Sequence, residues 1–161
     1  MAHKALVAYF STLRGNTAHV AEELADAIGA DLFEIVPEDE YSSTDLDWRN
    51  PDSRCNREHA DPSCRPAIAE EVRDWDSYDT LFLGFPIWWY TAPRIVETFL
   101  ESYDLTGKTV ALFATSGGSG LTKPEDELPA RFPQATWKPG RLFNGGVAAS
   151  TLRAWANGVM S

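Results

Sequence analysis

Residues 9–24 read YFSTLRGNTAHVAEEL, and in this stretch a polar cluster separates an apolar run from a helical pattern. The run before the cluster, Lys4–Phe10, is short and apolar, which is typical of a buried strand. After the cluster, Val20, Leu24 and Ile28 recur at a spacing of four, which indicates one face of a helix. The cluster is therefore predicted to be a loop between the carboxyl end of a strand and the amino end of a helix.

This loop carries groups that suit an anion. The amino end of a helix has unpaired backbone N–H groups and a positive dipole, so a phosphate is favoured there. The loop adds hydroxyls, an amide, a guanidinium and a glycine that allows close backbone approach. The residues concerned are Ser11, Thr12, Arg14, Gly15, Asn16 and Thr17. The alternative is a simple helix cap, because Asn or Thr is common before a helix for that reason alone.

Strand and helix patterns alternate along the rest of the chain. Further strands are predicted over 31–37, 80–86 and 108–115, and a fifth includes Leu142 and Phe143. Further helices are predicted over 67–75, 92–103, 123–132 and 147–159. The polar interval 38–66 has no clean period, and we interpret it as a functional loop or a small insertion with some helix. The alternation predicts one α/β domain, residues 1–161, with a mostly parallel sheet covered on both faces.

Ligands of open α/β sheets bind beyond the carboxyl ends of the strands, and two more loops at such ends are unusual. The third strand leads into Pro86, Ile87, Trp88, Trp89 and Tyr90. Large apolar groups are costly to expose, so they either cover a flat aromatic ligand or pack onto the helix below. The fourth strand leads into Thr115, Ser116, Gly117, Gly118 and Gly120. This loop either brings its backbone close to a ligand or is a flexible connection.

Composition and charge exclude several classes of protein. The net charge of −10 repels nucleic acid and anionic membranes and favours basic protein partners. There is no run of about 20 apolar residues and no signal peptide pattern, so we expect a cytoplasmic protein without membrane insertion. Cys55 and Cys64 are expected to be reduced thiols, although they could pair, and their spacing does not fit a zinc site.

No catalytic motif is present in the sequence. The GKT at 107–109 lacks the upstream glycine of a phosphate-binding loop, and there is no GxGxxG or GxSxG. The three histidines have no obvious Ser or Cys to activate. We therefore expect no catalytic side chain and no metal ligand, and a phosphate-ester hydrolase is the least favoured class.

Together the three loops resemble those of the flavodoxin-like proteins. The stretch YFSTLRGNT looks like their phosphate-binding signature, and GFPIWWYTAPRIVETFLE and TSGGSG are similar to their two flavin-ring loops. The resemblance implies a three-layer α/β sandwich with a five-stranded parallel sheet in the order 2-1-3-4-5. It also implies FMN as the cofactor. The phosphate would lie on Ser11–Thr17, and the flavin ring between Pro86–Tyr90 and Thr115–Gly120.

Three functions are compatible with this resemblance. The leading hypothesis is FMN-dependent electron transfer with redox partner proteins that have a basic surface. The second is an NAD(P)H-dependent FMN or quinone oxidoreductase, with a space over the flavin shaped by residues 38–66. The third is a flavin-free interaction module that keeps the fold. The interval 38–66 differs from that of small electron-carrier flavodoxins, and Arg14 stands where the family usually has a small hydroxyl residue.

The Arg14→Glu variant tests the anion loop. We expect weaker FMN binding, because a carboxylate would replace the predicted cation beside the phosphate. Titration with FMN, followed by flavin fluorescence, measures the affinity. Unchanged affinity would show that Arg14 points to solvent.

Overall fold

Five parallel strands form one sheet in the computed structural model, which describes residues 4–12, 15–116, 120–144 and 147–161. The strands are β1 (Ala5–Tyr9), β2 (Asp31–Glu34), β3 (Thr80–Pro86), β4 (Thr109–Thr115) and β5 (Thr136–Leu142). Their order is β2-β1-β3-β4-β5, and every neighbouring pair is parallel. The predicted fold class and strand order are confirmed.

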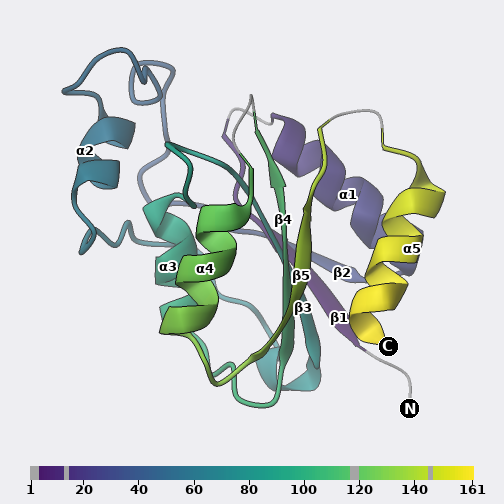
Figure 1. Cartoon of the computed structure of the whole chain (residues 1–161). Helices are drawn as coiled ribbons and strands as arrows, with labels where there is room; N and C mark the ends of the chain where they lie inside the picture. The colour runs from purple at the N-terminus through teal and green to yellow at the C-terminus, as the bar shows by residue number, and fades with distance from the viewer. Residues whose placement is uncertain (1–3, 13–14, 117–119, 145–146) are drawn as a thin grey trace.

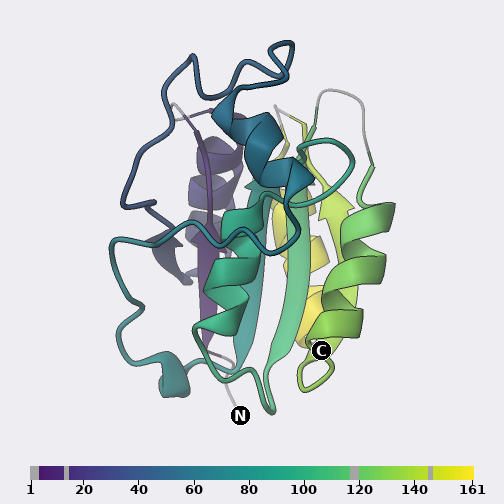
Figure 2. The same ribbon diagram turned by 90° about the vertical axis from the view of Figure 1, so that its left-hand side faces the viewer.

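Helices cover both faces of the sheet. The helices are α1 (Asn16–Ile28), α2 (Arg54–Ala60), α3 (Arg94–Glu101), α4 (Thr122–Arg131) and α5 (Ala149–Met160), with a 3₁₀ turn, η1, at Trp75–Ser77. The α1 and α5 helices lie on one face and α3 and α4 on the other, while α2 lies outside the α3 and α4 layer, near the carboxyl end of the sheet (Figures 1 and 2). Within the described ranges, no helix is long and apolar enough to cross a membrane.

The buried strands divide their side chains between two cores. On β1, Leu6 and Ala8 pack in the core under α3 and α4, whereas Val7 and Tyr9 pack under α1 and α5. Strands buried on both faces appear as continuous apolar runs, which is why β1, β3 and β4 were predictable. The two cores make the sheet the rigid middle layer from which the loops extend.

The strand β5 is longer than predicted. The prediction placed the fifth strand at Leu142 and Phe143, with residues 136–141 only leading into it. The strand TWKPGRL in fact ends at Leu142 and includes Pro139 and Gly140, which are uncommon inside strands. The structure pairs Thr136–Leu142 with β4, with a register shift between Ala111 and Phe113. Pro139 is tolerated because β5 is an edge strand and bonds a neighbour on one side only.

The segment between β2 and β3 contains one wrong prediction. We call residues 38–74 the excursion, and its helix, α2, lies inside the polar interval as expected. The predicted helix over 67–75 is absent, and only η1 forms at its end. Residues 67–69 are instead extended, with Glu38 N donating to Ala67 O (2.9 Å) and Ala69 N donating to Val36 O (2.7 Å). Tertiary pairing therefore overrides the helical propensity of AIAEEV.

The ring of Phe113 on β4 leaves no space for a side chain at Gly84 on β3. A Cβ at Gly84 would lie 2.2 Å from Cζ of Phe113, a fully buried ring on β4. We expect Gly84→Ala to lower the free energy of unfolding by about 1–3 kcal/mol, measured by urea denaturation. The control is Gly158→Ala on α5, which meets nothing within 4 Å and should raise stability by about 0.5–1 kcal/mol. A Gly84→Ala chain as stable as the original would contradict this packing.

Candidate functional site

Three loops meet at the carboxyl ends of β1, β3 and β4. They line a hollow of about 320 Å³ whose walls include ten of the predicted site residues. These are Ser11, Thr12, Gly15, Asn16, Thr17, Pro86, Ile87, Trp88, Thr115 and Ser116. The sequence-predicted residues thus come together from three separate parts of the chain.

The remaining predicted residues lie elsewhere or outside the described part of the chain. Trp89 lines an adjoining hollow, and Tyr90 is exposed at the tip of its turn. Gly120 is exposed and is not among the residues that line either hollow. Arg14, Gly117 and Gly118 fall outside the described residues.

The polar end of the hollow lies at the beginning of α1. The N-cap residue of this helix is Gly15, which has no side chain with which to cap the first turn. Gly15 N donates to Thr12 O (3.0 Å), and a Cβ at Gly15 would lie 3.1 Å from that same oxygen, so a side chain at Gly15 would be crowded. A 13-residue helix that starts in this way presents its first amide groups and its positive dipole end to an anion.

Thr17 has a structural role at this end. Its hydroxyl is buried and hydrogen-bonded to the hydroxyl of Thr115, Oγ1 to Oγ1 2.7 Å. Because Thr115 ends β4, this bond joins the first loop to the third. Ser116 N in turn donates to Oδ1 of Asn144 (2.9 Å), which ties the third loop to the segment after β5.

The aromatic end is a strained turn. Trp88 N donates to Thr91 O (2.9 Å) and Thr91 N donates to Trp88 O (3.0 Å), which closes a two-residue turn. Its central residues, Trp89 and Tyr90, have φ of 51° and 68°, a conformation usually taken by Asn-Gly. The left-handed region costs a residue with a side chain about 1–2 kcal/mol. Strain of this kind gathers at functional sites, so the turn is a candidate ligand contact.

The excursion supplies a wall of an adjoining hollow, and sequence reasoning, which expected residues 38–66 to shape a space there, did not identify the residues that form it. The adjoining hollow, about 290 Å³, is shared by Thr12, Ile87, Trp88 and Trp89 with Leu46, Trp48 and Cys55 of the excursion. Trp48 is 62% exposed. The polar interval has no periodicity from which to place these residues. A single tryptophan within so polar a stretch was the one available signal.

Trp88 is held from below by the excursion. Its ring contacts Phe10 and Tyr41 edge to face, with centroids 5.7 and 5.4 Å apart. The Tyr41 hydroxyl donates to the Glu58 carboxylate, and the Arg54 guanidinium lies 3.8 Å from the centroid of the Tyr41 ring. Burial, followed by the Glu58 hydrogen bond, raises the pKa of Tyr41. The hydroxyl is therefore protonated at physiological pH and remains a donor.

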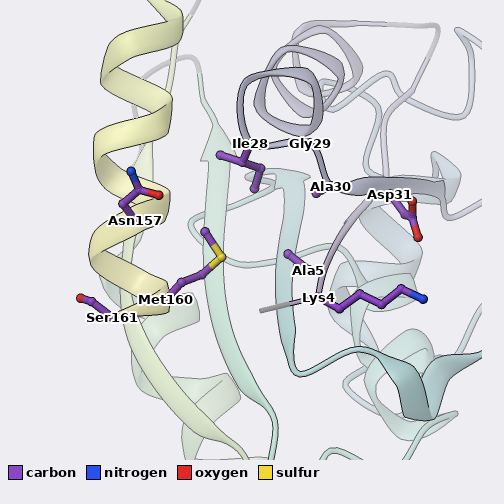
Figure 3. A pocket seen from close by; sticks show the side chains of 9 residues that line it. All are labelled: Lys4, Ala5, Ile28, Gly29, Ala30, Asp31, Asn157, Met160 and Ser161. Carbon is purple, nitrogen blue, oxygen red and sulfur yellow. The ribbon is translucent and has the colours of Figure 1, made fainter. Parts of the chain in front are cut away.

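A larger hollow, about 530 Å³, lies at the opposite end of the sheet. Figure 3 shows it between the end of α5 at Met160 and the beginning of β1 at Lys4 and Ala5. This is the amino end of the strand, where open α/β sheets do not place their ligands. None of the residues that the sequence predicted for the cofactor site lines this hollow, so we assign the functional site to the carboxyl end of the sheet.

Comparison with known proteins points to one family. A model of the flavodoxin family matches residues 4–159. A candidate flavoprotein from Bacteroides eggerthii is 45% identical, with a TM-score of 0.93 over 98% of each chain. One from Bacteroides uniformis is 43% identical, with a TM-score of 0.90 over 98% of this chain and 99% of that one. A comparison with curated proteins gives no match.

A more distant structure shares the fold. It is a flavoprotein in complex with FMN from Lactobacillus acidophilus, 21% identical, with a TM-score of 0.73. The match covers 96% of this chain and 99% of that one.

The strained turn predicts a gain in stability from Tyr90→Gly. Glycine removes about 1–2 kcal/mol of left-handed strain and costs about 0.5–1 kcal/mol through the unfolded chain. We therefore expect the free energy of unfolding of the ligand-free protein to rise by about 0.5–1 kcal/mol, measured in urea. Tyr90→Ala is the matched control, because it removes the ring and keeps the strain. Equal stabilities of the two variants would refute a strained turn.

Proposed function

The chain belongs to the flavodoxin family, and from that premise we propose that it binds FMN and transfers electrons between partner proteins. The observation that carries the proposal is the single hollow that joins the uncapped beginning of α1 to the tryptophan turn. One end suits a phosphate and the other suits a flat ring, and FMN has both. The FMN complex of the Lactobacillus acidophilus protein, which shares the fold, supports the same cofactor.

The residues present fit the phosphate of FMN. Hydroxyl oxygens, an amide and helix N–H groups are the donors that bind a phosphate, and Ser11, Thr12 and Asn16 bring them to the hollow. No carboxylate lines this hollow among the described residues. A dianion would therefore meet donors and the positive end of a helix dipole without a facing negative charge.

The residues at the other end fit the flavin ring. Pro86 ends β3, and Ile87 and Trp88 follow it directly. All three are half-buried, so they present an apolar surface on a rigid support. Ile87 N donates to Thr115 O (2.9 Å), which holds the second and third loops together. Apolar walls of this kind exclude water from one side of a bound ring and orient its edge toward the opening.

Bound FMN would supply the redox chemistry, and the chain would set its surroundings. Nothing in electron exchange requires a side-chain acid or base. The net charge of −10 disfavours the addition of electrons to a cofactor near the surface, which lowers its potential within the limit that salt screening allows. The same charge favours redox partners with a basic surface and speeds their approach. We place this exchange in the cytoplasm, where the free thiols of Cys55 and Cys64 would stay reduced.

An absorption spectrum tests the proposal. The purified protein is saturated with FMN, freed of excess flavin, and then mixed with NADPH or NADH without oxygen. We expect retained flavin absorbance that neither nucleotide bleaches, because a carrier accepts electrons from a partner protein. Rapid bleaching would indicate a nicotinamide-dependent oxidoreductase instead of a carrier. Loss of the flavin during removal of the excess would overturn the assignment of FMN as the cofactor.

A matched pair of variants locates the phosphate. Thr12→Glu places a carboxylate in the hollow, and we expect it to weaken FMN binding by more than about tenfold through charge repulsion. Thr122→Glu adds the same charge at the exposed beginning of α4 and should leave the affinity unchanged. Flavin fluorescence titration measures both. Equal affinities would place the phosphate elsewhere.

A further inference from the structure

The side-chain amide of Asn56, on α2, joins three segments of the chain. Its Nδ2 donates to the backbone oxygens of Trp48 (2.9 Å) and Asn50 (2.7 Å). Its Oδ1 accepts a hydrogen bond from Nε1 of Trp89 (2.6 Å). Two carbonyls require a donor and an indole N–H requires an acceptor, so only one orientation of the amide satisfies all three bonds.

The two tryptophans joined in this way face each other. The rings of Trp48 and Trp89 are in edge contact, with centroids 6.1 Å apart and planes at 78°. They are 62% and 39% exposed, so little packing holds them. The His59 ring lies 6.2 Å from Trp89, and burial, followed by the charge of Arg94, lowers the pKa of His59 so that it is neutral at pH 7. Other charges near His59 are those of Lys123 and Glu127.

The helix that carries Asn56 is fixed to the core. Arg94, on α3, donates to the backbone oxygens of Glu58 (3.3 Å) and His59 (2.7 Å) near the end of α2. Arg94 is buried and paired with buried Glu97 (3.2 Å). Glu97 also forms ion pairs with Arg65 of the excursion (3.2 Å) and with Arg131 of α4. Because α2 is anchored by this ion network, Asn56 is a fixed point to which the tryptophan turn is attached.

The strained turn needs such an attachment. A left-handed Trp89 persists only when its surroundings determine its conformation. The bonds between Trp88 and Thr91 close the turn but do not direct the indole. Among the described residues, Asn56 is the hydrogen-bond partner of that indole.

We propose that Asn56 is a positioning residue that holds Trp89 and Trp48 as facing walls, so that the excursion forms part of the flavin-ring site. The claim that these walls contact the flavin ring, the cofactor half, rests on the proposed function. The claim that Asn56 holds the two tryptophans in place, the positioning half, does not. The hollow between these walls, about 290 Å³, shares Thr12, Ile87 and Trp88 with the hollow assigned to FMN. A change at Asn56 therefore reaches the cofactor through the indoles, without direct contact.

A double-mutant cycle tests the cofactor half. Asn56→Ala should raise the FMN dissociation constant about 2- to 12-fold, the equivalent of one lost hydrogen bond. In a Trp89→Phe chain, which keeps a ring but lacks the indole N–H, the same change should raise it by a smaller factor, because only the bonds to the Trp48 segment remain to be lost. Asn157→Ala, at an exposed position on α5, is the matched control and should leave the affinity unchanged. Equal fold-changes in both backgrounds would overturn the coupling.

Hydrogen exchange of the flavin-free protein tests the positioning half. Asn56→Ala should speed exchange at the N–H of Thr91, which closes the strained turn, and of Asn50, which bonds to Asp47 O in the Trp48 turn. Exchange in the central strand β3 should stay slow, which separates local release from global unfolding. Unchanged exchange at Thr91 and Asn50 would overturn the positioning role. A parent chain that retains no FMN would instead overturn the proposed function and the cofactor half with it.

Discussion

The site depends on the parallel register of the three central strands. Tyr9 of β1 pairs with Gly84 of β3, and Gly84 pairs with Phe113 of β4, so the three loops begin at one level. Parallel strands place their carboxyl ends at the same edge, and no other arrangement of these elements would bring the three loops together. The close contact at Gly84 leaves this register little freedom to slip. The pairing of the central strands thus sets the relative positions of the polar and aromatic ends of the site.

The sequence was informative where local chemistry and tertiary structure agree. Continuous apolar runs located β1, β3 and β4, and the Ser11–Thr17 cluster located the beginning of α1. Prediction from the sequence failed where hydrogen bonds between distant parts of the chain decide the conformation. Residues 67–69 are helical by propensity but pair with 36–38, and β5 contains a proline that only an edge position allows. Trp48 and Asn56 gave no periodic signal, because hydrogen bonds and ring contacts place them instead of an apolar face.

A buried ion network helps to attach the excursion to the domain. Glu97, 4% exposed, is surrounded by three arginines from α3, α4 and the excursion. A buried carboxylate left without its partners is costly, so the network favours the placement of the excursion against α3. In a chain with 24 acidic and 14 basic residues, this cluster takes several of the available cations.

Pro139 has an effect beyond the domain itself. An open edge of a sheet is a template on which further strands can add, and β5 is such an edge. The missing N–H of Pro139 removes one donor from that template, and Lys138 and Arg141 place like charges on either side of it. Two copies of the chain that meet along β5 would face a gap in the ladder and mutual repulsion. The irregular strand β5 therefore resists the addition of a second copy of the chain at its own edge of the sheet.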